Sequence, residues 1–269
     1  MSTGLLAGRT ELDKFGKSSN NQLTKGYIMD TLSKSNGVII YQGPSKLDGK
    51  PIVVVATGLT KTSANGKTGD MVQTWILRAD IAPHEAIKTG DDESICGNCP
   101  LRGINGKERA CYVVTHQAPL SVYRAFHKGN YPEATHADLI ALAVNRMVRL
   151  GSYGDPAAVP TQVWAMFTQG TKGWTGYTHQ WATASDLKPY TMASCETEED
   201  RAEAILQGWR TFRVKTDDMP LLKNEVVCPA TTVGLSCEAC GSCKGTTGQA
   251  KGTIVINVHG YGKKHLKAA

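Results

Sequence analysis

The chain has 269 residues, of which 41% are hydrophobic, 20% charged and 7% aromatic. This composition excludes collagen-like, coiled-coil and wholly disordered chains, and no run of about 18 apolar residues suggests a membrane span. The 30 Lys and Arg residues outnumber the 24 Asp and Glu residues, and the resulting net charge of +6 permits contact with nucleic acid or a phosphorylated substrate without requiring it. The N-terminal residues lack the pattern of a secretory signal, so we expect the protein to work in a cytoplasm.

The N-terminal part of the sequence predicts a polar arm followed by strands. The first 25 or so residues are polar and aperiodic. Runs of β-branched residues over 37–43 and 51–56 predict a hairpin, and 72–77 reads as a further strand. We therefore expect residues 1–80 to form an arm and a small β-rich flank that packs on the rest of the protein.

Helical and extended patterns alternate from residue 81 onward. The helical segments are 119–128, 137–147, 161–168 and 198–207. The extended segments are 148–150, 174–179, 191–194, 211–215, 226–227 and 253–258. This alternation predicts parallel βα units. Since about six such units follow one another, we expect an α/β fold in which 81–269 forms a cysteine-rich partial parallel βα barrel with a basic C-terminal tail.

The eight cysteines all lie in the later two thirds of the chain. One group has the spacing C-x2-C-x11-C, another has the spacing C-x8-C-x2-C-x2-C, and one cysteine stands between the groups. In chain order they are Cys96, Cys99, Cys111, Cys195, Cys228, Cys237, Cys240 and Cys243. A long chain without a secretory signal uses clustered cysteines for metal binding more often than for disulfides. We therefore predict that all eight are metal ligands.

The spacing of the cysteines favours iron–sulfur chemistry. Two small residues between thiolates allow a tight turn whose amides can donate to sulfur. The two consecutive C-x2-C steps that end at Cys243 are typical of runs that bind a 4Fe-4S cluster, and we expect one or two such clusters. Zinc is the alternative at the C-terminal group, because Cys228 stands apart from the closely spaced cysteines.

The first group supplies only three thiolates. Its fourth ligand is expected to be Cys195, a cysteine of the second group, or a group that is not protein. In the last case the free iron could bind a substrate or a cofactor. The other interpretation of Cys195 is a small buried apolar residue at a strand end.

Polar candidates follow the predicted strands, where parallel βα folds collect their reactive groups. Asp155 is a candidate for binding a substrate amine, and His179 and Arg149 are candidates for binding a phosphate or carboxylate. Each has a structural alternative. Asp155 would then be a turn residue before Pro156, His179 a hydrogen-bonded residue at a strand end, and Arg149 a partner in an ion pair.

Several of these segments together resemble a bacteriophage family. They are the loop that ends in Cys111, RLGSYGD at 149–155, GYTH at 176–179 and the closing run from Cys228 to Cys243. Over roughly 94–244 the sequence resembles the "gene product 88" family of bacteriophages, which implies a phage-encoded protein in the host cytoplasm.

The layout is also similar to the radical S-adenosylmethionine (SAM) barrel. In that superfamily a three-cysteine loop after the first strand holds a 4Fe-4S cube with one open iron, and a glycine-rich segment after the second strand holds the methionine amine. The resemblance implies that SAM is a cofactor, with Gly151, Gly154 and Asp155 as cofactor-binding residues. The sequence departs from the family in the cysteine spacing, which is C-x2-C-x11-C instead of C-x3-C-x2-C.

Two functions compete at this point. The first is a phage-type iron–sulfur protein that acts as a redox or radical enzyme on a small-molecule or nucleotide substrate. The second is a zinc-stabilised module that binds nucleic acid without catalysis. The net charge and five interleaved aromatic residues favour this module, although core packing also explains such aromatics. The five are Tyr123, Tyr131, Trp174, Tyr177 and Trp181.

Overall fold

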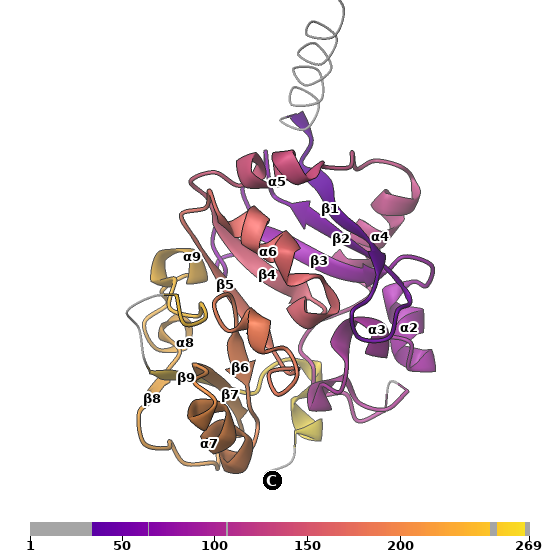
Figure 1. Ribbon diagram of the computed structural model, residues 1–269. Coiled ribbons are helices and arrows are strands. Elements are labelled where there is room, and N and C mark those ends of the chain that lie inside the picture. Colours follow the sequence, from indigo (N-terminus) through magenta and orange to yellow (C-terminus); the bar gives the residue numbers. More distant parts are fainter. Residues whose placement is uncertain (1–33, 64, 106, 248–251, 267–269) are drawn as a thin grey trace, which may run out of the picture.

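The computed structural model describes residues 34–63, 65–105, 107–247 and 252–266 (Figure 1). The predicted N-terminal arm and the last residue of the basic tail, Lys267, lie outside these ranges. No helix within the described ranges is long and apolar enough to cross a bilayer.

The described residues have an α/β fold built on one nine-stranded sheet, in the order β1-β2-β3-β4-β5-β6-β7-β9-β8 (Figure 1). Strands β1 to β3 are antiparallel, and all neighbours from β3 to β8 are parallel. The sheet is not closed. The strands are β1 (Gly37–Pro44), β2 (Pro51–Thr57), β3 (Val72–Arg78), β4 (Met147–Tyr153), β5 (Gly173–Thr178), β6 (Met192–Ser194), β7 (Thr211–Lys215), β8 (Glu225–Val227) and β9 (Thr253–Asn257).

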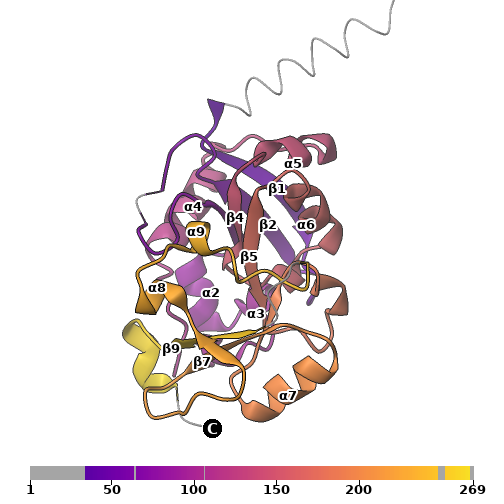
Figure 2. The ribbon, with the colours of Figure 1, turned by 90° about the vertical axis from the view of Figure 1, so that its left-hand side faces the viewer.

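Helices cover both faces of this sheet. Figure 2 shows α5 and α6 on one side of it and α2, α4, α8 and α9 on the other. The helices are α2 (Pro83–Thr89), α3 (Glu93–Cys96), α4 (Ala118–His127), α5 (His136–Leu142), α6 (Thr161–Thr168), α7 (Glu198–Leu206), α8 (Pro229–Thr232) and α9 (Cys237–Cys240). Short 3-10 turns lie at Pro100–Arg102, Pro156–Ala158, Ser185–Leu187 and Tyr261–His265.

The N-terminal strands extend the same sheet as the rest of the protein. The predicted hairpin is confirmed as β1 and β2, in which Val38 pairs with Ala56. β3 pairs with β2 on one edge and runs parallel to β4 on the other, with Val72 opposite Val148. The boundary expected at residue 80 therefore falls within one continuous sheet, and β3 begins its parallel part.

The helix expected over 137–147 is shorter than predicted. It ends at Leu142, and Asn145 adopts the left-handed conformation with a φ of 57°. The chain then enters β4, which extends from Met147 to Tyr153. This strand is longer than the one predicted over 148–150. Because the apolar residues after Leu142 fit a helix and a buried strand equally well, their periodicity alone predicted the wrong boundary.

The strand order differs from the chain order at the C-terminus. β9 lies between β7 and β8, and both of its neighbours run parallel to it. β8 is therefore an edge strand. The connection from β8 to β9 carries the second cysteine group on α8, α9 and the loops beside them.

Candidate functional site

A cavity of about 470 Å³ lies against one face of the parallel strands. Alternate residues of each strand line it, for example Gln73 and Trp75 of β3 and Phe212 and Val214 of β7. Since successive side chains of a strand point to opposite faces, these residues share one face of the sheet. The cysteine-bearing segments that follow β3 and β8 complete the wall.

All three cysteines of the first group line this cavity. They are free thiols, partly exposed to the cavity. Burial raises the pKa of the Cys96 thiol well above its usual value, and neighbouring Cys99 and Cys111 raise it further. The fold thus brings together three thiols whose sequence positions span 16 residues.

The buried carboxylate of Asp92 binds residues at both ends of the loop between Cys99 and Cys111. Asp92 Oδ1 accepts a hydrogen bond from Arg102 Nη2 at 2.8 Å, and Asp92 Oδ2 lies 3.6 Å from Arg109 Nη1. One carboxylate therefore holds both ends of the eleven-residue insertion. The backbone N–H of Cys111 also donates to Leu101 O at 2.8 Å. These contacts explain why Cys111 lies beside Cys96 and Cys99 although eleven residues separate it from Cys99.

The first cysteine group is fixed to the carboxyl ends of β4 and β5. The backbone N–H of Asp155 donates to Ile95 O at 2.6 Å. The Gln180 side chain donates from Nε2 to Cys96 O at 3.1 Å. Both contacts tie α3 to residues that directly follow strands, which is the edge of the sheet where the sequence places the site.

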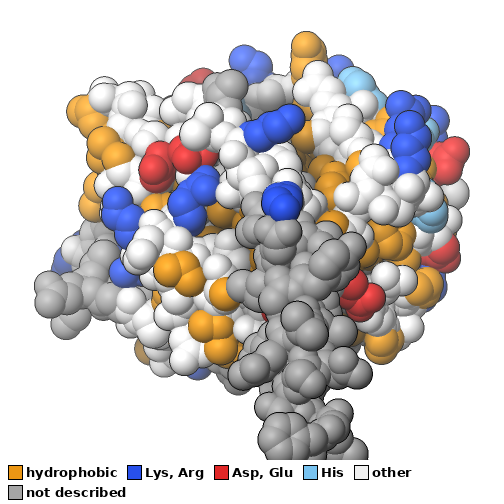
Figure 3. Space-filling model, turned by 90° about the horizontal axis from the view of Figure 1, so that it is seen from above, with side chains coloured by type: hydrophobic (Ala, Val, Ile, Leu, Met, Phe, Trp, Pro, Cys, Tyr) orange, Lys and Arg blue, Asp and Glu red, His pale blue; other side chains and the backbone are white. Residues whose placement is uncertain are grey.

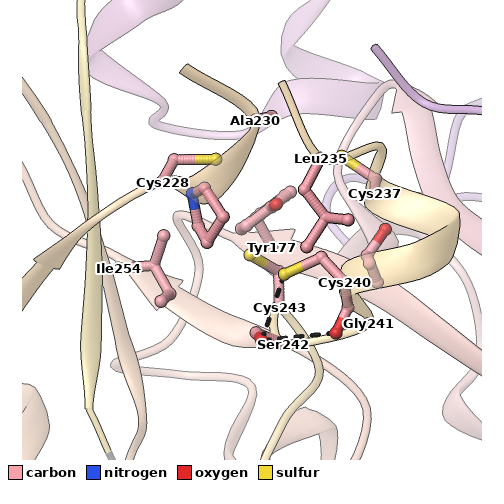
Figure 4. A pocket seen from close by; sticks show the side chains of 12 residues that line it. Tyr177, Cys228, Ala230, Leu235, Cys237, Cys240, Gly241, Ser242, Cys243 and Ile254 are labelled. Atoms are coloured by element: carbon pink, nitrogen blue, oxygen red, sulfur yellow. Dashed lines mark hydrogen bonds between the residues drawn. The ribbon is translucent and has the colours of Figure 1, made fainter. Parts of the chain in front are cut away.

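The second group surrounds a much smaller space. Cys228, Cys237, Cys240 and Cys243 all line a cavity of about 20 Å³, with the first two on opposite sides of it (Figure 4). Burial raises the pKa of Cys243 to about 12, and the other three thiols of the group act in the same direction. Cys228 and Cys237 also line the large cavity. The two groups therefore border one continuous region of the protein.

Hydrogen bonds from other parts of the chain hold the second group in place. The Arg210 guanidinium donates to Ser242 O at 2.9 Å and to Gly252 O at 3.3 Å, and it also contacts the carbonyl of Lys244. The backbone N–H of Cys237 donates to Lys67 O at 3.0 Å. The loop before β3 and the strand β7 thus support the cysteines that follow β8.

Several buried polar atoms beside the cysteines have no hydrogen-bond partner among the described residues. They include the donors Tyr153 Oη, Arg109 Nη2 and Thr175 Oγ1 and the acceptor Asp92 Oδ2. Tyr153 lines the large cavity, and Thr175 lines the small one. Burial raises the pKa of Tyr153 well above its usual value, and Cys96 is the next largest cause. Unpaired buried donors are costly in a folded protein, so they indicate acceptors that a bound group would supply.

Cys195 is separated from both groups. It is fully buried at the end of β6 and lines neither cavity. Burial raises its pKa to about 12, and the charged neighbours that contribute are Glu196, Asp200 and Arg201, none of them a cysteine. The geometry therefore matches the small buried apolar residue and gives no support to Cys195 as a ligand of the first group.

The other predicted residues, Asp155, His179 and Arg149, all line the large cavity. Asp155 is buried, and its carboxylate accepts from the backbone N–H groups of Ala157 and His179 at 2.9 and 2.8 Å. Burial raises its pKa despite these hydrogen bonds. Both carboxylate oxygens therefore organise the turn after β4, as the structural interpretation of Asp155 expected.

His179 lies between a thiol and a carboxylate. Its Nε2 is 3.0 Å from Glu196 Oε1, and its ring contacts the Cys99 side chain. Burial acts to lower its pKa, but the charges of Cys99 and Glu196 outweigh burial and raise that pKa well above 6.5. His179 therefore lies between Glu196 and the first cysteine group, with an imidazole whose protonated form these two neighbours favour.

The backbone conformation at positions 151 and 154, which line the large cavity, requires glycine. Both have left-handed φ values, of 68° and 82°. A Cβ on Gly154 would lie 2.7 Å from Ile76 Cβ and 2.9 Å from Ile76 O. Close approach of β3 thus explains the glycine at 154 without a cofactor, and cofactor binding by Gly151, Gly154 and Asp155 stays a prediction.

Sequence reasoning missed the residues that support the cysteines. Asp92, Arg109 and Arg210 belong to no motif, and Tyr153 lies in the segment 149–155 without having been singled out there. The roles of all four depend on contacts across the fold. The available signal was weak: a carboxylate and a guanidinium lie close in sequence to the first cysteine group.

Among the described residues, no three His, Cys, Asp or Glu side chains are placed to hold one metal ion. Comparison with protein-family models, curated proteins and solved structures found no match for this chain.

Proposed function

We propose that the protein is an iron–sulfur enzyme in which Cys96, Cys99 and Cys111 hold a 4Fe-4S cluster at the large cavity. The observation that carries the proposal is the convergence of these three thiols on the wall of a ligand-sized cavity. Pockets that bind small molecules typically have volumes of about 300–1,000 Å³. A cluster differs from a single ion because each thiolate binds a different iron, so the sulfurs need not approach one point.

The residues around the first group fit such a cluster. Its inorganic sulfides accept hydrogen bonds and its net charge is negative, and both properties suit a site with unpaired donors. Tyr153 Oη and Arg109 Nη2 are buried donors without partners beside these thiols. His179 contacts Cys99, and the Glu196 carboxylate at 3.0 Å favours the positively charged form of its ring. When bound, the cluster would supply electrons or a Lewis-acidic iron without a protein thiolate.

The chain's own residues would then place a substrate. Asp155 fixes the turn after β4, and the alternate side chains of the strands exclude bulk water from one wall of the cavity. Arg149 offers a guanidinium to an anionic substrate. The open, mostly parallel sheet with cysteines at its carboxyl edge supports a radical-SAM-like partial barrel, the superfamily that implies SAM as a cofactor. The proposal that the chain belongs to the phage "gene product 88" family rests on the sequence segments alone.

The second cysteine group would hold a separate closed centre. Four thiolates suit either zinc or a second 4Fe-4S cluster. The space of about 20 Å³ between them is sufficient for about one water molecule or ion, which suits zinc in size, but no three described His, Cys, Asp or Glu side chains are placed around one ion, so both centres stay candidates. Tyr177 donates to Cys243, and buried Thr175 Oγ1 offers a further donor.

Metal analysis of anaerobically purified protein tests the proposal. We expect iron and acid-labile sulfide in the wild type, and we expect Cys99→Ala to lose both. Cys240→Ala should lose zinc if the second centre is a zinc site, or additional iron and sulfide if it is a cluster. Cys195→Ala is the matched control and should keep all of them. Wild-type protein without iron, or unchanged iron in Cys99→Ala, would contradict the assignment.

The alternative nucleic-acid module has less support. Trp181 belongs to the core, and Tyr123, Tyr131 and Trp174 pack against it, while Tyr177 lies between the two cavities. These rings are therefore not presented on an outer surface for stacking on bases. On the visible part of the face in Figure 3, Lys and Arg side chains form several small groups and no continuous patch.

A further inference from the structure

The region between the two cysteine groups carries positive charge without acidic partners. Arg149 lines the large cavity, and its Nη2 donates to Tyr112 Oη at 2.8 Å. Lys67 lies at the exposed mouth of the cavity, with Nζ 3.2 Å from His259 Nε2. Among the described residues, neither cation lies within 4.0 Å of a carboxylate.

These cations belong to one connected cluster. The Tyr112 and His259 rings stack with centroids 5.1 Å apart and an angle of 26° between their planes. His259 Nδ1 lies 3.2 Å from Asn257 O, so the Nδ1–H donates there and Nε2 is free to accept from Lys67. Lys67, His259, Tyr112 and Arg149 therefore form a chain of contacts along one side of the cavity.

The cavity offers no carboxylate to balance this charge. Asp155 is the only acidic residue among the described residues that line it, and both of its oxygens already accept backbone hydrogen bonds. Lys67 is exposed, whereas Arg149 is half-buried against the cavity, and a charge partly withdrawn from water is normally paired. An arginine with only a phenol as hydrogen-bond partner therefore indicates that an anionic ligand supplies the missing partner.

Flat aromatic side chains adjoin the same charges. The Arg149 guanidinium lies 5.6 Å from the centre of the Tyr177 ring, and that ring packs against Phe212 with centroids 4.4 Å apart. Trp75 lines the cavity as well, and its Nε1 already donates to Thr57 Oγ1 at 2.8 Å. Such surfaces stack on planar unsaturated rings.

We propose that this cavity binds a small ligand that combines a planar ring with a phosphate or carboxylate, the anion lying at Arg149 and Lys67. The adjoining rings of Tyr177 and Phe212, beside Arg149, contact the planar part. The inference rests on the proposed function because it names the substrate class of the same cavity. It does not depend on which metal the cysteines hold.

Binding to full-length, anaerobically purified protein tests this inference by isothermal titration calorimetry. The probes are the four ribonucleoside 5′-monophosphates, nicotinate and 4-hydroxybenzoate. Each is paired with an uncharged partner, namely the nucleoside, nicotinamide or 4-hydroxybenzamide, and ribose 5-phosphate supplies an anion without an aromatic ring. We expect at least one anionic aromatic probe to bind at least about tenfold more tightly than its uncharged partner and than ribose 5-phosphate.

Variants locate the anion. Arg149→Gln should weaken the best probe at least about tenfold, because the truncated site leaves the anion unpaired. Arg149→Lys should retain part of the affinity, and Lys128→Gln, an exposed lysine that lines neither cavity, should retain all of it. Failure of every probe to bind with a dissociation constant below about 1 mM overturns the inference. Equal binding of charged and uncharged partners, or an unaffected Arg149→Gln, also overturns it.

Iron, sulfide and zinc are measured on the same samples. If protein without iron binds an anionic probe, the proposed cluster is refuted and the proposed ligand site is supported. If protein with iron and sulfide binds no probe, the ligand site is refuted and the cluster is supported. An Arg149→Gln protein that loses its metal would show that the guanidinium serves the cysteine groups, and this result also overturns the ligand site.

Discussion

The two cysteine groups are built in different ways although both use C-x2-C turns. A buried carboxylate, Asp92, pairs with two arginines in the first group, and all three of its cysteines face a cavity of about 470 Å³. In the second group the Arg210 guanidinium donates to backbone carbonyls, and the four cysteines enclose about 20 Å³. The comparison separates a group that faces the large cavity entirely from one that reaches it only through Cys228 and Cys237. Four substitutions can break or sharpen this difference.

The largest effect is expected for Asp92→Asn. The substitution leaves Arg102 and Arg109 without their buried counter-charge, and breaking such a pair costs about 3–5 kcal/mol. We expect lower stability in urea unfolding and loss of metal from the first group alone. Glu93→Gln is the control, because Glu93 is the exposed neighbour of Asp92. Equal metal loss from both groups would show that they fold as one unit.

Gly154→Ala should have the next largest effect. Alanine in the left-handed conformation costs about 1–2 kcal/mol, and overpacking against Ile76 adds about 1–3 kcal/mol. Gly129→Ala isolates the backbone contribution, because Gly129 has a φ of 68° and nothing lies within 4 Å of its added Cβ. Urea unfolding of both variants measures the difference. Equal losses of stability in the two variants would mean that β3 accommodates the new methyl group at residue 154 without a change in free energy.

Arg210→Met tests the second group. It removes the guanidinium from the carbonyls of Ser242 and Gly252, at a cost of about 1–3 kcal/mol for partners left unsatisfied. Metal should be lost from the second group while iron stays at the first. Arg124→Met, at an exposed arginine of α4, should change neither. Loss of iron from the first group in Arg210→Met would contradict the separate support of the two groups.

The smallest effect is a pH dependence at β8, which leads into Cys228. Burial acts to raise the pKa of Glu225, but hydrogen bonds from Arg213 at 2.6 and 2.7 Å outweigh burial and lower it below 4.5. A lowered folded-state pKa gives stability that is complete above pH 4.5 and is lost as the pH falls through that lower value.

Urea unfolding of the wild type and Glu225→Gln between pH 3 and pH 6, each value set by buffer, measures this dependence. The difference in stability between the two proteins should shrink as the pH falls. Glu203→Gln, at an exposed glutamate of α7, should parallel the wild type. A constant difference across this range would exclude Glu225 as the titrating group.

Most strands could be predicted from local sequence because their signals are local. The β-branched runs of β1 and β2 and the turn between them define a hairpin. A capping box of Thr135 and Asp138, also a local pattern, begins α5. The predicted end of α5 was wrong because the left-handed conformation at Asn145 turns the chain into β4, which the apolar periodicity does not show.

The candidate site was only partly predictable. The spacing of cysteines anticipates which thiols line a common cavity, and the rule for strand ends anticipates Asp155 and His179 at the large cavity, where Arg149 of β4 also lies. Neither signal can show that Asp92 pairs with two arginines or that Arg210 hydrogen-bonds to the loop of Cys243. These contacts depend on how the loops fold against the sheet, which no local pattern encodes.

The position of β9 between β7 and β8 affects the order in which the protein can mature during synthesis. β9 is synthesised after β7, β8 and all eight cysteines, and His259, which follows it, stacks on Tyr112 beside the first cysteine group. Both cysteine groups therefore obtain their surroundings only after the chain has been translated through His259. A metal that needs those surroundings would bind after this point and not while the cysteines first emerge.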